Sequence, residues 1–160
     1  MDAAKPEDKF NFGKAKVVVI DASAISQEVA ANILQAYGFR MIFRCGDLAA
    51  AGNTLALNKI DLVLLDPYSF GDEGYDFVRK LRADTQSANT LVPVIMVTAY
   101  TPIRSVTAAQ GCGADYMIAK PFSTGSLLER IRWVATKAGH RSELATQQTV
   151  SKEGSGMELW

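Results

Sequence analysis

Four polar side chains, each directly after a short apolar run, carry the chemistry that this sequence offers. The runs and the residues that follow them are Val17–Ile20 with Asp21, Leu62–Leu65 with Asp66, Val94–Val97 with Thr98, and Met117–Ala119 with Lys120. Two carboxylates can supply an oxygen nucleophile and ligands for a hard cation, while a hydroxyl and an ammonium can donate hydrogen bonds to anionic oxygens. Each residue alone has an ordinary structural explanation. Together they are the parts of a site that holds a phosphoryl group.

The apolar runs themselves predict the strands that position these side chains. Each run is unbroken rather than alternating, which is typical of a strand that is buried on both faces. A weaker strand is predicted over Arg40–Arg44, where three apolar residues stand between two arginines. That mixed composition fits a strand at the edge of a sheet.

Helical periodicity fills the segments between the strands. The first predicted helix is capped by Ser23 and ends at Gly38, and its apolar residues are Ile25, Val29, Ile33 and Tyr37. The second is an alanine-rich helix over Leu48–Leu57, which starts after Asp47. The third predicted helix is marked by Tyr75, Val78, Leu81 and Arg82. The fourth has Pro102 in its first turn and ends at Gly111 or Gly113. The fifth begins near Ser123 and carries on one face Leu127, Leu128, Ile131, Val134 and Ala135. A capping box of Ser126 and Glu129 is an alternative start for the last helix.

The regular alternation of strands and helices predicts an α/β fold, a doubly wound five-stranded parallel sheet with five helices. Ligands of such sheets bind beyond the carboxyl ends of the strands. Since each of the four polar residues follows a strand, we expect their side chains to converge at one edge of the sheet.

The motifs, in this order and at this spacing, resemble the response-regulator receiver domain of two-component signalling, of the chemotaxis-response-regulator kind, over residues 16–138. The matching residues are Asp21, Asp66 with Gly74 eight residues later, Thr98-Ala99, and Lys120-Pro121-Phe122. The resemblance implies the flavodoxin-like receiver fold. It also makes the Lys120–Pro121 bond a candidate for the cis form.

The resemblance implies a role for each residue of the site. Asp66 is the expected phosphoacceptor, attacking the phosphohistidine of a partner sensor histidine kinase or phosphotransfer protein. Thr98 and Lys120 are expected to bind phosphoryl oxygens. Mg²⁺ is the expected cofactor, held by Asp21, Asp66 and the backbone carbonyl of Tyr68.

The sequence departs from the family pattern in its acidic pocket. The family usually has two adjacent acids after the first strand, whereas this chain has Asp21-Ala22. The loss of one carboxylate predicts weaker Mg²⁺ binding and slower or absent phosphotransfer, because a charge pair ~4 Å apart is worth ~4 kcal/mol at an effective dielectric constant of 20. Asp72 and Glu73 could compensate, the alternative being that they lie in a solvated loop.

Three further positions modulate the expected site. Tyr68 and Tyr100 each stand two residues after a site residue, where the two rings could shield a phosphoryl group from water; the alternative is ordinary exposed tyrosines. Met117, with Tyr116 beside it, occupies the place of the family's switching aromatic. A flexible methionine can repack but has no hydroxyl, so the family's coupling between phosphate and output face is in question.

Composition excludes several broad classes. The 160 residues carry 17 Lys and Arg against 17 Asp and Glu, for a formal net charge of zero. A neutral balance argues against general nucleic-acid binding and against a polybasic membrane patch. No segment has the ~20 mostly apolar residues of a membrane helix. Two cysteines, Cys45 and Cys112, are too few for a disulfide framework. We therefore expect a cytoplasmic protein with no nucleic-acid or membrane partner.

The chain divides into three expected parts: an N-terminal extension over 1–15, the receiver domain over 16–138 and a flexible C-terminal tail over 139–160. The tail is polar except at its tip, Met157-Glu158-Leu159-Trp160. It is too short and polar for a DNA-binding unit. The expected function is therefore that of a stand-alone receiver that signals through contact with a downstream protein.

Two other functions remain to be weighed. One is a pseudo-receiver that keeps the fold as a docking scaffold and works without phosphate. The other is a nucleotide- or flavin-binding enzyme, which the segment Asp21–Ser26 disfavours because it lacks the glycines that let a backbone approach a phosphate. A dehalogenase-type phosphatase needs a second Asp two residues after its nucleophile, where this chain has Ser23 or Tyr68. We expect no enzymatic activity.

Overall fold

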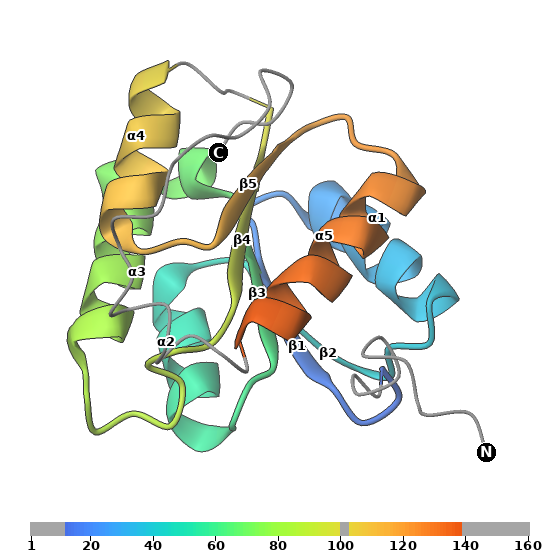
Figure 1. Cartoon of the computed structure of the whole chain (residues 1–160), viewed down its shortest axis with the longest axis horizontal. Coiled ribbons are helices and arrows are strands. Elements are labelled where there is room, and N and C mark those ends of the chain that lie inside the picture. Colours follow the sequence, from blue (N-terminus) through green and yellow to red (C-terminus); the bar gives the residue numbers. More distant parts are fainter. Residues whose placement is uncertain (1–11, 100–102, 139–160) are drawn as a thin grey trace.

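Strands and helices alternate along the whole of the described chain, as the apolar runs predict. The computed structural model describes residues 12–99 and 103–138 (Figure 1). The strands are β1 (Lys16–Ile20), β2 (Met41–Cys45), β3 (Leu62–Leu65), β4 (Val94–Thr98) and β5 (Tyr116–Ala119). The helices are α1 (Ala24–Ala36), α2 (Leu48–Leu57), α3 (Asp72–Ala83), α4 (Ile103–Cys112) and α5 (Thr124–Ala138), with a short 3-10 helix, η2 (Pro67–Phe70), between β3 and α3.

The five strands form one parallel sheet in the order β2-β1-β3-β4-β5. This confirms the α/β, doubly wound fold class. Every residue of β3 and β4 is buried, whereas β2 at the sheet edge keeps Met41 and Arg44 exposed. The edge position predicted from the two arginines is therefore correct.

The helices cover both faces of the sheet, with α1 and α5 on one side and α2, α3 and α4 on the other (Figure 1). Alternate strand residues face the two layers, so the core divides into two apolar clusters. One cluster includes Leu65, Met96 and Met117 under α2–α4, and the other includes Leu64 and Ile118 under α1 and α5. Strands buried on both faces explain why the apolar runs do not alternate.

Local hydrogen bonds set the predicted helix starts. The Ser23 hydroxyl accepts from the Ser26 N–H at 3.2 Å, and the Asp47 carboxylate accepts from the Ala50 N–H at 2.7 Å. Ser123 caps α5 by accepting from the Ser126 N–H at 3.1 Å. Ser126 itself lies inside α5. The alternative capping box is therefore wrong.

Two details could not be derived from the sequence patterns. The stripe from Ile25 to Tyr37 faces the core only in part: Ile33 and Tyr37 pack against the cluster under α1 and α5, whereas Ile25 is 76% and Val29 51% exposed. The fully buried residues of α1 are Ala31 and Leu34. The segment after Asp66 forms η2, a short helix that neither the apolar runs nor the helical periodicity predicts. Of the two glycines proposed to end α4, Gly111 lies inside the helix and Gly113, with a φ of 100°, follows it.

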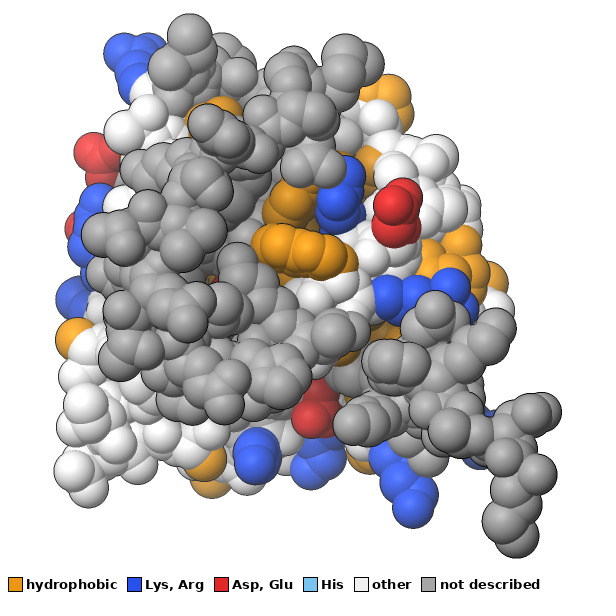
Figure 2. All heavy atoms as spheres, in the orientation of Figure 1, with side chains coloured by type: hydrophobic (Ala, Val, Ile, Leu, Met, Phe, Trp, Pro, Cys, Tyr) orange, Lys and Arg blue, Asp and Glu red, His pale blue; other side chains and the backbone are white. Residues whose placement is uncertain are grey.

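Some expectations fall on residues outside the described ranges. These are Tyr100, Pro102 as the predicted start of α4, residues 1–11 of the N-terminal extension, and the C-terminal tail with its apolar tip. No helix in residues 12–99 and 103–138 is long and apolar enough to span a membrane. On the face shown in Figure 2, the described Lys and Arg side chains are scattered and interspersed with Asp and Glu, in keeping with the net charge of zero.

Candidate functional site

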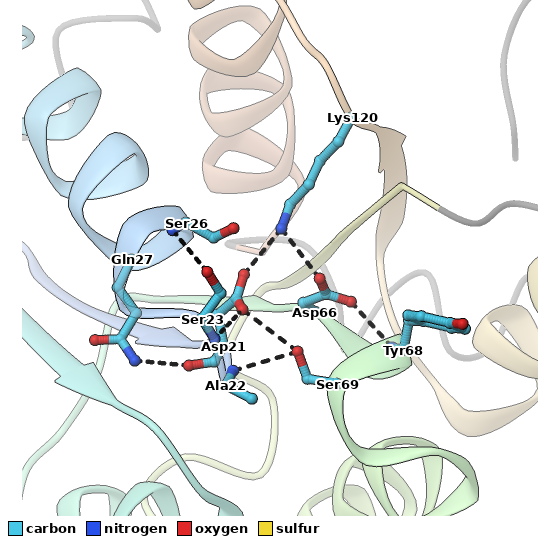
Figure 3. Close-up of polar contacts among 9 residues, drawn as sticks. All are labelled: Asp21, Ala22, Ser23, Ser26, Gln27, Asp66, Tyr68, Ser69 and Lys120. Atoms are coloured by element: carbon cyan, nitrogen blue, oxygen red, sulfur yellow. Dashed lines mark hydrogen bonds and ion pairs between the residues drawn. The ribbon is translucent and has the colours of Figure 1, made fainter.

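Lys120 lies between two carboxylates at the carboxyl edge of the sheet (Figure 3). Its ammonium donates to Asp21 Oδ2 at 2.9 Å and to Asp66 Oδ2 at 3.0 Å. The three residues follow β1, β3 and β5, so the parallel arrangement brings together groups as far as 99 positions apart in sequence. Two carboxylates and one ammonium leave one net negative charge in a small, partly buried space.

Asp21 is the most enclosed of these groups, with only 6% of the residue exposed. Its Oδ1 accepts from the Ser23 backbone N–H at 2.8 Å, so the turn that starts α1 also holds this carboxylate. The Gln27 side chain donates to the Asp21 backbone carbonyl at 2.6 Å. The first turn of α1 therefore orients Asp21 from two sides and leaves Oδ2 directed at Lys120.

Asp66 caps η2 in a similar way. Its Oδ1 accepts from the Tyr68 N–H at 3.0 Å, while Oδ2 is bound to Lys120. The close approach of Gly74 supports this turn, because a Cβ at that position would lie 3.0 Å from Pro67 Cα and 3.1 Å from Pro67 O. A side chain at the glycine eight residues after Asp66 would therefore press against the backbone of η2, which would have to shift.

The environment of Lys120 keeps it protonated. Burial by itself lowers the pKa of its ammonium, but the hydrogen bonds and charges of Asp21 and Asp66 outweigh burial and raise the pKa above its ordinary value. The Lys120–Pro121 peptide is cis, as the resemblance implies. The backbone N–H of Lys120 also donates to the Thr98 carbonyl at 2.8 Å, which fixes the position of Lys120 against β4.

Thr98 ends β4 at the same edge and is only 1% exposed. Its neighbours Val97 and Ala99 line the groove that contains the three charged residues, so alternation places the Thr98 side chain toward the α3–α4 side. Met117 is fully buried in the cluster on that side. Both residues therefore lie on the face of the sheet that α2, α3 and α4 cover.

Tyr68 contributes its backbone to the site, while its ring is 67% exposed and points away from Asp66 and Lys120 (Figure 3). The proposed shielding by Tyr68 and Tyr100, and the role of the Tyr68 carbonyl as a cation ligand, stay predictions.

Ser69 is a site residue that sequence reasoning missed. Its hydroxyl donates to Asp21 Oδ1 at 3.3 Å and accepts from the Ala22 N–H at 3.2 Å, joining η2 to the end of β1 (Figure 3). The sequence did contain a hint, because Ser69 has a small polar side chain in the segment Pro67–Phe70, whose other residues are aromatic or apolar. Nothing in the spacing pointed to its partner.

An apolar groove opens beside the charged groups, with a volume of about 360 Å³. We call it the α1 groove; its walls include Ile25, Val29 and Ile33 of α1 and Pro121 and Phe122 after β5. The exposed half of the α1 apolar stripe therefore lines a groove that leads to Asp66, rather than the core.

The donor set is of the type that binds Mg²⁺. This ion takes oxygen ligands, keeps several waters and is commonly bound through one or two carboxylates. Asp21 and Asp66 supply two carboxylates, and Ala22 supplies none. Asp72 and Glu73 lie exposed in the first turn of α3. Over the described residues, no group of three or more His, Cys, Asp or Glu side chains is arranged to hold a metal.

Fold and site together define a signal-receiving α/β domain with an acidic pocket. The family model for the response regulator receiver domain matches residues 17–132. The chain belongs to this family, and it is a receiver domain of two-component signalling.

Relatives with known names agree with this assignment. The phosphate regulon transcriptional regulatory protein PhoB of Escherichia coli is 27% identical over 143 residues, covering 89% of this chain and 60% of PhoB. The DNA-binding response regulator MtrA of Mycolicibacterium paratuberculosis is 35% identical over 125 residues, covering 74% of this chain and 50% of MtrA. This chain thus spans only about half to three-fifths of the length of these relatives.

Solved structures show the same fold. The chemotaxis protein CheY4 of Vibrio cholerae matches with a TM-score of 0.68 and 25% identity, covering 75% of this chain and 98% of CheY4. A response regulator from Thermotoga maritima matches with a TM-score of 0.67 and 28% identity, covering 76% and 98% of the two chains.

Proposed function

We propose that this receiver accepts a phosphoryl group on Asp66 from the phosphohistidine of a sensor histidine kinase or phosphotransfer protein. The observation that carries the proposal is the placement of the Asp66 carboxylate 3.0 Å from the Lys120 ammonium, which Asp21 also holds. An anionic nucleophile beside a fixed cation is suited to receive a group with anionic oxygens.

The transfer makes one bond and breaks another. An Asp66 carboxylate oxygen attacks phosphorus, the P–N bond to the histidine breaks, and the imidazole leaves with the bonding electron pair. The Lys120 ammonium neutralises charge on the incoming phosphoryl oxygens, and Asp21 holds that ammonium in place. The Thr98 hydroxyl, on the α4 side, donates to another of those oxygens.

Asp21, Asp66 and the Tyr68 carbonyl would hold Mg²⁺ in this pocket. The ion would supply positive charge to the phosphoryl oxygens. Because Ala22 removes one carboxylate, we expect binding weaker than in receivers that carry both acids.

The α1 groove supports docking of the phosphodonor. Receiver domains interact with histidine kinases and phosphotransfer proteins, and the groove presents the apolar side chains of Ile25 and Val29 beside Asp66. The buried Met117 and Thr98 lie toward α4, so we propose that the signal leaves through that side by contact with another protein. PhoB is named a transcriptional regulatory protein and MtrA a DNA-binding one; for this chain, a stand-alone role without nucleic acid stays a proposal.

The test uses acetyl phosphate with Mg²⁺ and intact-mass measurement of the full chain. We expect an adduct of one phosphoryl group that Asp66→Asn abolishes. Asp72→Asn is the matched control, because it removes an exposed carboxylate of α3 outside the Lys120 cluster, and it should leave the adduct unchanged. An adduct that persists in Asp66→Asn would contradict the assignment of the acceptor.

The second candidate is a receiver that serves as a docking scaffold without phosphate. The observation that favours it is the missing acid at Ala22. Absence of any adduct, in a sample that still binds a partner kinase, would support the scaffold over the phosphoacceptor.

A further inference from the structure

Ser69 and Ala22 form a pair that none of the motifs contains. Ala22 follows β1 and Ser69 lies in η2, 47 positions apart in sequence, and the Ser69 hydroxyl reaches the Ala22 N–H and Asp21 Oδ1 (Figure 3). The hydroxyl is thus hydrogen-bonded to both residues of the segment where the family has adjacent acids. Ala22 is exposed and its side chain carries no oxygen that could bind a cation.

We propose that Ser69 takes over part of the role of the missing acid at position 22, by orienting Asp21 and by giving its hydroxyl oxygen to the divalent cation. The inference rests on the proposed function in that the cation serves the same pocket. It concerns this chain's own residues and does not require that Asp66 be phosphorylated.

The hydrogen bonds of the Ser69 hydroxyl leave one of its oxygen lone pairs for a further ligand. A serine hydroxyl has one proton and two lone pairs. In Ser69 the proton goes to Asp21 Oδ1, and one lone pair accepts from the Ala22 N–H. The second lone pair remains for a cation, and its oxygen is the hard ligand type that Mg²⁺ prefers.

The contact also fixes Asp21 for a cation. Asp21 Oδ1 accepts from both the Ser23 N–H and Ser69, so the carboxylate cannot rotate without losing two hydrogen bonds. Mutation of groups that orient a metal ligand in this way typically lowers metal affinity by about 10- to 100-fold. A neutral hydroxyl supplies no charge, which agrees with a site weaker than one with two adjacent acids.

The first experiment measures Mg²⁺ binding to the full chain by isothermal titration calorimetry. We expect Ser69→Ala to weaken the affinity by about tenfold, and Ser69→Thr, which keeps the hydroxyl, to restore it. Ser26→Ala is the matched control, because Ser26 enters the contacts of Figure 3 through its backbone N–H and not its hydroxyl. Ser69→Ala with wild-type affinity would overturn the inference.

The second experiment is a double-mutant cycle with Ala22→Asp. A carboxylate at position 22 should strengthen Mg²⁺ binding and make the hydroxyl less necessary. The loss caused by Ser69→Ala should therefore be smaller in the Ala22→Asp background than in the wild type. Equal losses in both backgrounds would mean that Ser69 has no part in replacing the acid, and would overturn the inference. So would a wild type that binds no Mg²⁺ while Ala22→Asp does.

Failure of the inference can be told apart from failure of the proposed function. Intact mass after acetyl phosphate treatment is recorded for the same variants. No adduct on the wild type, together with weaker Mg²⁺ binding in Ser69→Ala, overturns phosphoacceptance and supports the role of Ser69. An adduct that Asp66→Asn abolishes, together with unchanged Mg²⁺ binding in Ser69→Ala, overturns the role of Ser69 alone.

Discussion

The two ends of the sheet each hold a basic side chain against a carboxylate, and they differ in what surrounds the pair. At the amino ends of β4 and β5, the Arg82 guanidinium donates to Asp115 Oδ2 at 3.1 Å, to the Thr90 carbonyl at 2.8 Å and to the Gly113 carbonyl at 3.0 Å. Asp115 Oδ2 also accepts from the Val94 N–H at 2.8 Å. This cluster joins α3 to the starts of both strands.

The pKa values at the two ends move in opposite directions. Burial lowers the pKa of Arg82 to about 10, with the nearby Cys112 acting the other way, so Arg82 stays charged at neutral pH. Lys120 faces two carboxylates instead of one, and their hydrogen bonds and charges outweigh burial and raise its pKa.

These differences indicate that the Arg82–Asp115 pair stabilises the fold, whereas the Lys120 cluster serves binding and chemistry. Arg82 directs its donors at groups of the protein and is enclosed by them. The Lys120 cluster has an excess negative charge and opens into the α1 groove. The amino end should therefore control stability, and the carboxyl end should control what the domain binds.

The largest effect on stability is expected from Arg82→Ala. The change leaves Asp115, whose side chain is only 10% exposed, without its cationic partner, and should lower the free energy of unfolding by about 3–5 kcal/mol. Urea denaturation measures it. The control is Arg79→Ala, which breaks an ion pair whose side chains are 50% and 54% exposed and should cost less than about 1 kcal/mol. Similar losses in both variants would contradict the structural role of the Arg82 cluster.

A smaller loss is expected from Gly74→Ala, which tests whether packing alone holds η2 at the site. The added Cβ would meet the Pro67 backbone at 3.0 Å, and overpacking of this kind costs about 1–3 kcal/mol. Gly52→Ala in α2 is the matched control, because nothing lies within 4 Å of the new Cβ; it should instead stabilise by about 0.5–1 kcal/mol. Thermal unfolding of the two variants in parallel decides, and a stabilised Gly74→Ala would show that η2 can shift freely.

Lys120→Met should lower the free energy of unfolding by about 1–2 kcal/mol at neutral pH, because two charged hydrogen bonds are lost. The loss should be smaller than for Arg82→Ala, since Asp21 and Asp66 line the α1 groove, from which water can reach them when Lys120 is removed. Because the folded-state pKa of Lys120 lies above its ordinary 10.5, its stabilisation is complete below that pH and is lost as the pH rises through the folded-state value. The difference between wild type and variant, measured by urea denaturation, should therefore disappear in strongly alkaline solution. A difference that stays constant into alkali would mean that the charge of Lys120 is not its source.

The smallest effect on stability is expected from Tyr68→Ala, within about 0.5 kcal/mol, because the ring is mostly exposed. If Asp66 is phosphorylated and the ring shields the product, the lifetime of the phosphorylated form should shorten in Tyr68→Ala and in Tyr100→Ala. Loss of the mass adduct over time gives the lifetime. Unchanged lifetimes in both variants would reject shielding.

The parts of this protein that could be predicted from sequence are those whose signal is local. The strands β1, β3, β4 and β5 were recognisable because burial on both faces leaves an unbroken apolar run. Ser23 and Asp47 were recognisable as caps because their partners lie three residues away. The apolar stripe of α1 was recognisable, but its environment was not, since periodicity identifies an apolar face and not what covers it: Ile33 and Tyr37 pack against the core, whereas Ile25 and Val29 are exposed.

The α/β class and the parallel sheet could be inferred from the amino-acid sequence, because strands and helices alternate regularly, and the family could be inferred from the motifs that follow the strands. The edge at which Asp21, Asp66 and Lys120 meet follows from the same pattern, because parallel strands have their carboxyl ends at one edge. The strand order and the contacts between distant polar groups were visible only in the folded domain. The hydrogen bond between Ser69 and Asp21 joins residues 48 positions apart. A single serine in a short helical turn has no periodic pattern from which a distant partner could be predicted. The same holds for the Arg82–Asp115 pair at the other end of the sheet. Long-range polar contacts depend on where the backbone places two distant segments, and the packing of the whole domain sets that position.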